Sequence, residues 1–118
     1  MKKEKIFAMP LASVYPHYVK KVESKGRSNK NLKPLFFWLT GYDVVALQKL
    51  LDNKTSFEDF FEKAPQLNPN VSKITGVICG YRVEEIEDPL MQKIRYLDKL
   101  VDELAKGKAL EKILRKDS

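Results

Sequence analysis

The chain has 118 residues, of which 43% are apolar and 32% are charged, and its formal net charge is +6. This length is typical of one domain with its own hydrophobic core, and we treat residues 1–118 as a single domain. No run approaches the roughly 18 consecutive apolar residues of a membrane span, so none is predicted. The single cysteine permits no internal disulfide, which fits a reducing compartment, and we expect a cytoplasmic protein.

The positive charge is unevenly distributed along the chain. Residues 1–30 carry eight Lys and Arg against two acids, residues 31–88 carry six against nine, and residues 89–118 carry eight against five. The basic ends could attract nucleic acid or acidic partners, but the solvated surfaces of ordinary helices have the same composition. Charge alone therefore does not select a function.

The first third of the chain predicts an extended start followed by a helix. Residues 1–12 are expected to be an extended N-terminal segment, and a short strand around Lys5–Met9 is one option. Pro16 is expected to open the first helix, because proline is tolerated best at the first helical position. That helix should run to about Ser24, and Gly26 ends it naturally.

A second helix is expected to reach Thr40, with Gly41 closing it, but its start has two interpretations. Ser28 is a fair N-cap, and in that case Pro34 would lie inside the helix and bend it. Alternatively, a loop continues to Lys33 and Pro34 occupies the first helical position. The sequence leaves both starts open.

Cap signals predict the elements in the middle of the chain. Asp43 should cap a helix, and Thr55 with Glu58 forms a capping box for a short helix that carries three phenylalanines. Asn68 followed by Pro69 repeats the pattern of a cap and then a proline. The middle of the chain therefore consists of short helices joined by short links.

Residues 74–86 combine signals for a helix and for a strand. Their isoleucine and valine content favours a strand, whereas the spacing of Ile74, Val77, Ile78 and Tyr81 fits one face of a helix better than strict alternation does. Glycines at positions 76 and 80 would lie on one side of that helix and let a neighbour approach closely. We therefore favour a buried central helix, with a strand as the alternative.

The closing helix has the clearest pattern in the chain. Asp88 is a good N-cap and Pro89 stands at the first helical position. Apolar residues recur along one face of this helix and form a seam about two heptads long, which ends before Gly107. A coiled coil needs a longer seam, so we expect this one to cover the core of this domain. Residues 108–118 form a basic C-terminal helix or tail, which we expect to be the part of the tail freest to meet a partner. The seam consists of Leu90, Ile94, Leu97, Val101 and Leu104.

Together these elements predict a mostly α-helical fold, a compact bundle of about five to seven short helices. The alternative is an α+β fold with a small sheet built from residues 5–9 and 74–86. No internal repeat, low-complexity tract or linker divides the chain.

Residues that could carry out catalysis are few. His17 is the only histidine and Cys79 the only cysteine. The two could form a nucleophile and base pair, but a reactive thiolate needs a cationic, partly exposed setting, and Cys79 lies in an apolar run where a buried residue is expected. A small enzyme using His17 is accordingly the third hypothesis for function. No zinc motif, calcium loop or phosphate-binding glycine loop is present, and we predict neither a metal nor a cofactor.

The first helix is the candidate for a binding surface. Its tyrosines alternate with basic residues, which is the pattern of a nucleic-acid contact, although core-facing tyrosines would produce the same spacing. The basic N-terminal third therefore supports a second hypothesis, a weak nucleic-acid binder with a steep dependence on salt. The candidate binding residues are Tyr15, His17, Tyr18, Lys20, Lys21 and Arg27.

Four long stretches of the chain resemble a family of short bacterial proteins. They are ASVYPHYVKKVESKGR, WLTGYD, FEDFFEKAPQLNPN and the run from ITGVICGYRVEEIEDPL to LEKILRK. That family is catalogued as domain of unknown function 2200, and the resemblance runs from about Lys5 to Lys116. It implies a bacterial, single-domain, cytoplasmic protein and brings no activity, ligand or catalytic residue. Pro34 departs from the helix-compatible polar residue expected there, which again concerns the start of the second helix.

The leading hypothesis for function is a non-enzymatic binding module that acts through a helical surface. Every catalytic constellation in the sequence lacks a partner residue, and this absence favours binding over catalysis. The partner could be a second copy of the chain, giving a homodimer, or another protein. Nucleic acid is the weaker option, and no membrane contact is expected.

Overall fold

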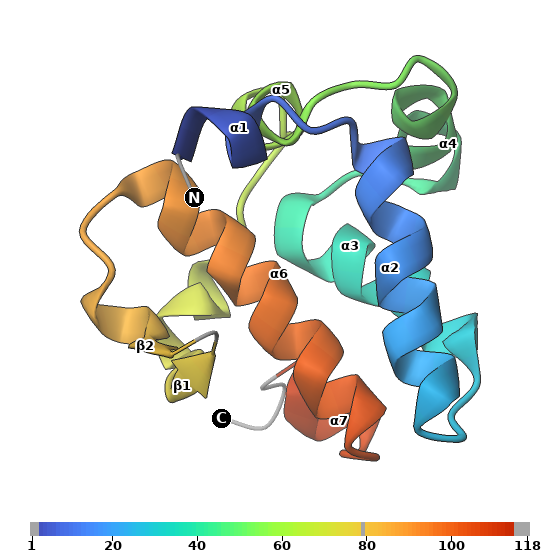
Figure 1. The fold of residues 1–118 in the computed structure, drawn as a ribbon, viewed down its shortest axis with the longest axis vertical. Coiled ribbons are helices and arrows are strands. Elements are labelled where there is room, and N and C mark those ends of the chain that lie inside the picture. The colour runs from blue at the N-terminus through green and yellow to red at the C-terminus, as the bar shows by residue number, and fades with distance from the viewer. Residues whose placement is uncertain (1–2, 79, 115–118) are drawn as a thin grey trace.

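Helix α6 (Pro89–Ala105) runs through the middle of the fold, and the other elements pack around it (Figure 1). The computed structural model describes residues 3–78 and 80–114. The helix begins as predicted, since the Asp88 carboxylate accepts a hydrogen bond from the backbone N–H of Met91 at 3.0 Å. The predicted seam is confirmed too. Its first member is half-buried, and its other members are buried: Ile94, Leu97, Val101 and Leu104.

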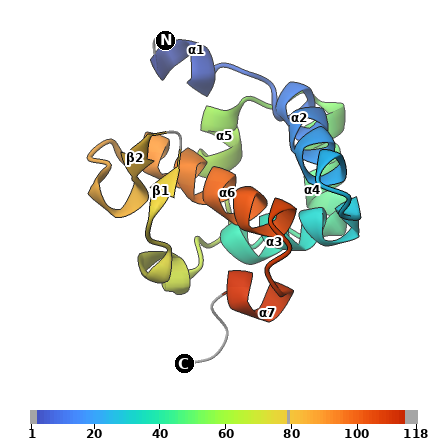
Figure 2. The same cartoon turned by 60° about the horizontal axis from the view of Figure 1, so that its bottom comes forward.

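Helices from both halves of the chain cover α6. α2 (Leu11–Ser24) and α3 (Leu32–Thr40) make the largest contacts with it, and α5 (Phe57–Glu62) and α7 (Leu110–Ile113) add smaller ones. α4 (Val44–Asp52) packs on α2 instead. Figure 2 shows α6 in the middle, with a β-hairpin on one side and α2 with α4 on the other. The predicted fold class, mostly α-helical, is confirmed.

The described part of the N-terminal segment begins with a helix, α1 (Lys3–Phe7), so the prediction of an extended segment over residues 1–12 is wrong for residues 3–7 and, since α2 has begun by then, for residues 11–12. The strand considered at Lys5–Met9 is wrong for the same reason. Lysine and glutamate are good helix formers, and the last two residues of α1 are half-buried against the core. Extended backbone is limited to the link into α2, where the Met9 carbonyl accepts a hydrogen bond from the Phe57 N–H at 2.9 Å.

Helix α2 begins at Leu11, so Pro16 lies inside the helix rather than at its start. A proline there lacks the N–H of one helical hydrogen bond. The burial of an apolar stripe along the helix offsets that loss, because one side of α2 faces the core at every turn. The buried residues of the stripe are Leu11, Val14, Tyr18 and Val22.

Helix α3 begins at Leu32 and contains Pro34 in its first turn, where a missing N–H costs least. The 3-10 helix η1 (Asn29–Asn31) leads into it, and the Ser28 hydroxyl accepts a hydrogen bond from the Lys30 N–H at 3.1 Å. The cap at Ser28 therefore belongs to η1. Neither of the two predicted starts of this helix is correct as it stands.

Side-chain caps set the starts of α4, α5 and the 3-10 helix η2 (Pro69–Lys73), and two of these three caps were predicted. Asp43 caps α4, and Asn68 caps η2. The cap of α5 is Ser56 rather than Thr55, and its hydroxyl accepts a hydrogen bond of 3.2 Å from the backbone N–H of Asp59 in the first turn. The Thr55 carbonyl instead accepts a hydrogen bond of 2.7 Å from the start of α2.

Two short strands, residues 77–78 and 81–82, form a β-hairpin, so the favoured prediction of a buried helix from residue 74 is wrong. β1 (Val77–Ile78) pairs antiparallel with β2 (Tyr81–Arg82). Gly76 has φ +110° and Gly80 has φ +85°, and glycine adopts such values readily while a right-handed helix does not. The alternative of a small sheet is confirmed for this segment, but residues 5–9 take no part in it.

The tail after Gly107 folds back onto the core. Gly107 ends α6 as predicted, with φ +87°, and α7 follows. Ile113 and Leu114 are 0% and 5% exposed, so their side chains are part of the core. The expectation that the segment after Gly107 is free to meet a partner does not hold for these two side chains, whereas Lys108, Glu111 and Lys112 are exposed.

Candidate functional site

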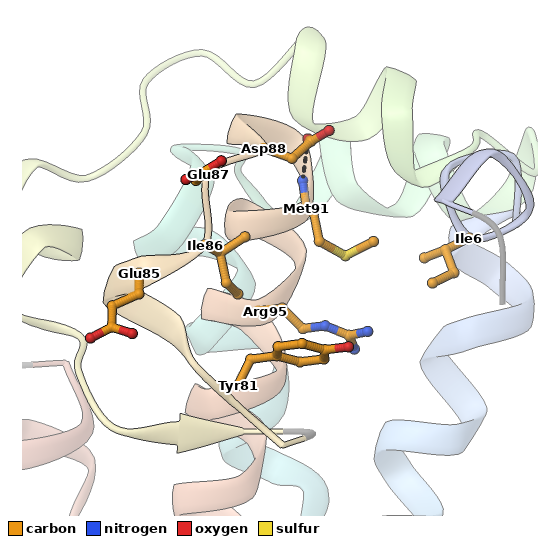
Figure 3. Close-up of a pocket in the computed structure, with 8 residues that line it drawn as sticks. All are labelled: Ile6, Tyr81, Glu85, Ile86, Glu87, Asp88, Met91 and Arg95. Carbon is orange, nitrogen blue, oxygen red and sulfur yellow. Dashed lines mark hydrogen bonds between the residues drawn. The ribbon is translucent and has the colours of Figure 1, made fainter.

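An open pocket lies at the N-terminal end of α6, between α1, the β-hairpin and the 3-10 helix η3 (Val83–Glu85) (Figure 3). Its volume is about 510 Å³, which falls in the range of roughly 300–1,000 Å³ that is typical of ligand sites. Three separate segments of the chain contribute to it. The lining residues are Ile6, Tyr81, Glu85, Ile86, Glu87, Asp88, Met91 and Arg95.

The loop that carries the acidic side of the pocket is fixed to α6. Val83 is fully buried, and its carbonyl accepts a hydrogen bond from the Gln92 side-chain amide at 3.1 Å. At the end of the loop the Asp88 cap closes onto the N–H of Met91. Because both ends are tied to the same helix, the residues between them hold defined positions over the pocket.

Apolar and aromatic side chains line the middle of the pocket. Ile6, Ile86 and Met91 are each half-buried, whereas Tyr81 is 63% exposed. Figure 3 shows the Tyr81 ring and the Arg95 head group both extending toward the side where Ile6 lies. The pocket thus presents an aromatic face and apolar walls to the solvent.

Arg95 is the cation of the pocket, and a chain of hydrogen bonds from α2 holds it in place. Its Nη1 donates to Asp98 Oδ2 at 2.8 Å, with the arginine side chain 19% exposed. The other carboxylate oxygen of Asp98 accepts a hydrogen bond from the Tyr18 hydroxyl at 2.6 Å. Asp98 therefore orients the guanidinium and largely neutralises its charge.

A second set of charges braces the hairpin beside the pocket. Glu84 accepts a hydrogen bond from the Gly76 N–H at 3.0 Å and pairs with Arg82 at 2.7 Å. Hydrogen bonds from its own backbone N–H and from that of Gly76 hold the pKa of the Glu84 carboxyl below its ordinary value, and Arg82 adds to this. Glu85 lies farther away, 3.9 Å from Arg82.

The two tyrosines predicted as binding residues serve the core. Tyr15 packs its ring on Phe36 with the centroids 5.6 Å apart, and burial raises the pKa of its hydroxyl. Tyr18 is 8% exposed and also packs on Phe36. Of the six predicted residues only Tyr18 reaches the pocket, and it does so indirectly, through Asp98 and Arg95.

The predicted basic residues lie toward the opposite end of α6. Lys21 pairs with Asp102 at 3.3 Å, and the guanidinium of Arg27 lies where a Cβ on Gly107 would stand. Lys20 is exposed on α2. A shallow pocket of about 360 Å³ is present there, lined by Lys99, Asp102, Glu103, Lys106, Gly107 and Lys108. Since Asp102 pairs with two lysines and Glu103 with a third, these acids offset part of the positive charge.

The structure does not place His17 at either pocket. His17 is exposed on α2 and lines neither of them. The prediction about Cys79 lies outside the described residues. Within residues 3–78 and 80–114, no three side chains of His, Cys, Asp or Glu gather in a way that could hold a metal ion.

Sequence reasoning missed most of the pocket. Tyr81 was assigned to a buried helix face, and Arg95 stood on the polar side of the α6 seam without any signal of a role. The acidic run before Asp88 was the one available sign, but acidic residues at the start of a helix are common and do not by themselves indicate a site. Ile6 could not be found, because its segment was expected to be extended.

The comparisons with known proteins identify a family but no activity. A family model described as "Uncharacterized protein conserved in bacteria (DUF2200)" matches residues 5–115. The crystal structure of the uncharacterized protein SP1917 is similar, with 47% sequence identity and a TM-score of 0.90, and the match covers 98% of this chain and 94% of that one. No curated protein matches the chain. Among the described helices none is long and apolar enough to cross a bilayer. The chain belongs to the DUF2200 family of uncharacterised bacterial proteins, as the sequence resemblance predicted.

Proposed function

We propose that this protein is a non-enzymatic binding module, and that the pocket at the N-terminal end of α6 receives a segment of a partner protein. The observation that carries the proposal is the exposure of Tyr81, which is 63% accessible beside the half-buried Ile86 and Met91. An exposed tyrosine next to apolar walls is typical of the residues that dominate binding energy at protein interfaces. Both α1 and α6 line the pocket, so the site uses a helical surface together with the hairpin.

The open form of the pocket favours a protein segment over a small molecule. Sites for small molecules usually bury roughly 70–90% of their ligand. Here Tyr81, Glu85 and Glu87 are all exposed, so a small ligand would keep much of its surface in water. A protein segment brings its own surface to cover these side chains.

The chemistry of the lining also favours binding over catalysis. Its residues comprise three aliphatic or thioether side chains, one tyrosine, one arginine and three acids, with no histidine, serine or cysteine among them. The arginine is already held by Asp98. These residue types suit recognition, and we assign no reaction to them.

A random peptide library displayed on phage tests the proposal. The wild-type chain should enrich peptides whose binding is lost on Tyr81→Ala. Val44→Ala is the matched control, because Val44 is 62% exposed on α4 and does not line the pocket. Enriched peptides that bind Tyr81→Ala as well as wild type, or a selection that enriches none, would overturn the proposal.

A further inference from the structure

We infer that the segment bound in this pocket is cationic and amphipathic, with an arginine or lysine next to an apolar side chain. The inference rests on the proposed function and adds the chemistry of the partner to it. It follows from the balance of charge around the pocket and from the type of surface in its middle.

The charged groups at and around the pocket are predominantly acidic. Four carboxylates lie along the loop and a fifth lies behind Arg95, against two guanidinium groups, which gives a net charge of −3. Counting the exposed Lys5, which neighbours Ile6 on α1, and Lys99, whose Nζ donates to the Val77 carbonyl at 3.4 Å, leaves −1. The carboxylates belong to Glu84, Glu85, Glu87, Asp88 and Asp98, and the guanidinium groups to Arg82 and Arg95.

Each positive feature of the pocket already faces a carboxylate of the chain itself. Arg95 has its charge matched by Asp98 at 2.8 Å. The N-terminus of α6, where an anion would otherwise be favoured, is occupied by the Asp88 carboxylate on the N–H of Met91. An incoming carboxylate would meet the acidic side of the pocket, whereas a cation would be attracted to it.

The stability of α6 explains part of this acidity but not all of it. Asp88 caps the helix and Glu84 braces the hairpin through the Gly76 N–H. Glu87 is exposed, and Glu85 has Arg82 only at 3.9 Å, beyond hydrogen-bond distance. Figure 3 shows both side chains on the side of the pocket opposite Ile6. These two carboxylates are the ones we assign to the partner.

The middle of the pocket matches the rest of a basic side chain. A cation over the face of a tyrosine is attracted by the ring electrons, and the ring of Tyr81 is exposed. The methylene stem of arginine or lysine packs well on apolar surface while the head stays in water. Ile86 and Met91 provide that surface, and a neighbouring apolar side chain of the partner can reach toward Ile6.

The test uses three capped peptides that differ only in the middle side chain, which is arginine, citrulline or glutamate between two leucines. Each is titrated into the isotopically labelled full chain while NMR follows the amide signals of Tyr81, Ile86 and Met91. We expect the arginine peptide to bind tightest, about three- to tenfold ahead of the citrulline peptide, since exposed charge pairs are individually modest. Glu87→Gln should weaken the arginine peptide about two- to fivefold. Glu111→Gln, an exposed glutamate on α7, should change nothing.

Each outcome of this titration separates the inference from the proposed function. If citrulline or glutamate binds as tightly as arginine at these signals, the cationic assignment is overturned and the proposed function stands. If the arginine peptide shifts none of them, the assignment is overturned as well, and the library selection decides independently whether the pocket binds peptides. An arginine peptide whose binding is insensitive to Glu87→Gln would contradict the role given to that carboxylate.

Discussion

The hydrogen bond between Tyr18 and Asp98 can be tested directly, because one substitution removes only the hydroxyl group that donates it. Tyr18→Phe deletes the hydroxyl that donates to Asp98 at 2.6 Å. The ring stays where it is, packed on Phe36 with the centroids 6.2 Å apart. The variant therefore loses the hydrogen bond to Asp98, a residue far from Tyr18 in the sequence, and it opens no cavity beyond one oxygen atom.

The size of the effect follows from the charge and the burial of the acceptor. A hydrogen bond to a charged group contributes about 1.5–3 kcal/mol. Asp98 keeps its pair with Arg95, and its side chain is 16% exposed, so water replaces part of the loss. We expect the free energy of unfolding to fall by about 1.5 kcal/mol. With an unfolding entropy of about 2.1 cal/mol/K per residue, this lowers the melting temperature by about 6 °C.

Urea titration and scanning calorimetry measure both quantities, and Tyr15→Phe is the matched control. Tyr15 also packs on Phe36, but its hydroxyl makes no hydrogen bond within residues 3–78 and 80–114, so its removal should change stability by less than about 0.5 kcal/mol. Equal losses in the two variants would refute the reasoning. The Nε–H signal of Arg95 should shift only in Tyr18→Phe, because only that change frees a carboxylate oxygen of Asp98.

Four further predictions follow from the same structure. Gly41→Ala should cost about 2–3 kcal/mol and Gly26→Ala about 1, since both have positive φ but only at Gly41 would a Cβ meet backbone, 3.2 Å from Gln66; equal losses by urea titration would contradict this. The NMR signal of the Gly76 amide should change with pH as Glu84 titrates. The pKa of Glu84 is lowered in the folded chain, so its hydrogen bond to the Gly76 N–H stabilises the hairpin above the ordinary value of 4.5 and is lost as pH falls through the lower folded value. A Glu84→Gln variant should show no such change. Light scattering should find a monomer, because the α6 seam is buried within the chain; a dimer that Tyr81→Ala disperses would make a second copy the occupant of the pocket. Binding to duplex DNA, measured by fluorescence anisotropy, should be negligible at about 150 mM salt; tight binding there, lost in a Lys20→Glu and Arg27→Glu double variant, would restore the nucleic-acid hypothesis.

Helix starts were the most predictable part of the fold, because a cap is a contact between residues close in sequence. Asp43, Asn68 and Asp88 all cap the helices assigned to them. Boundaries failed where a contact from elsewhere decided the matter. Ser56, and not Thr55, caps α5, and the Thr55 carbonyl accepts a hydrogen bond from the first residue of α2. Helix α2 begins at Leu11, before Pro16, because burial of its apolar stripe offsets the hydrogen bond that the proline cannot make.

The hairpin shows why apolar spacing can favour the wrong element. Both a helix face and a two-stranded turn can place Ile74 and Ile78 in the core, and both residues are buried. The glycines decide between them, through positive φ values that a sequence does not display. The Val83 N–H then closes the hairpin on the Gly76 carbonyl at 2.9 Å. Small-residue spacing was taken as a surface for helix packing, when it marked two backbone reversals.

The acidic run from Glu84 to Asp88 bears most directly on the binding site. In the sequence alone, favourable charge at the start of α6 is enough to explain the whole run. The structure divides it: Asp88 caps the helix, and Glu84 holds the Gly76 N–H and Arg82. Glu85 and Glu87 remain exposed at the pocket. Asp88 and Glu84 stabilise the fold through hydrogen bonds, whereas Glu85 and Glu87 lie in solvent. Neutralising Glu87 should therefore leave the melting temperature nearly unchanged and should weaken the binding of a cationic segment. Neutralising Asp88 should lower the melting temperature itself.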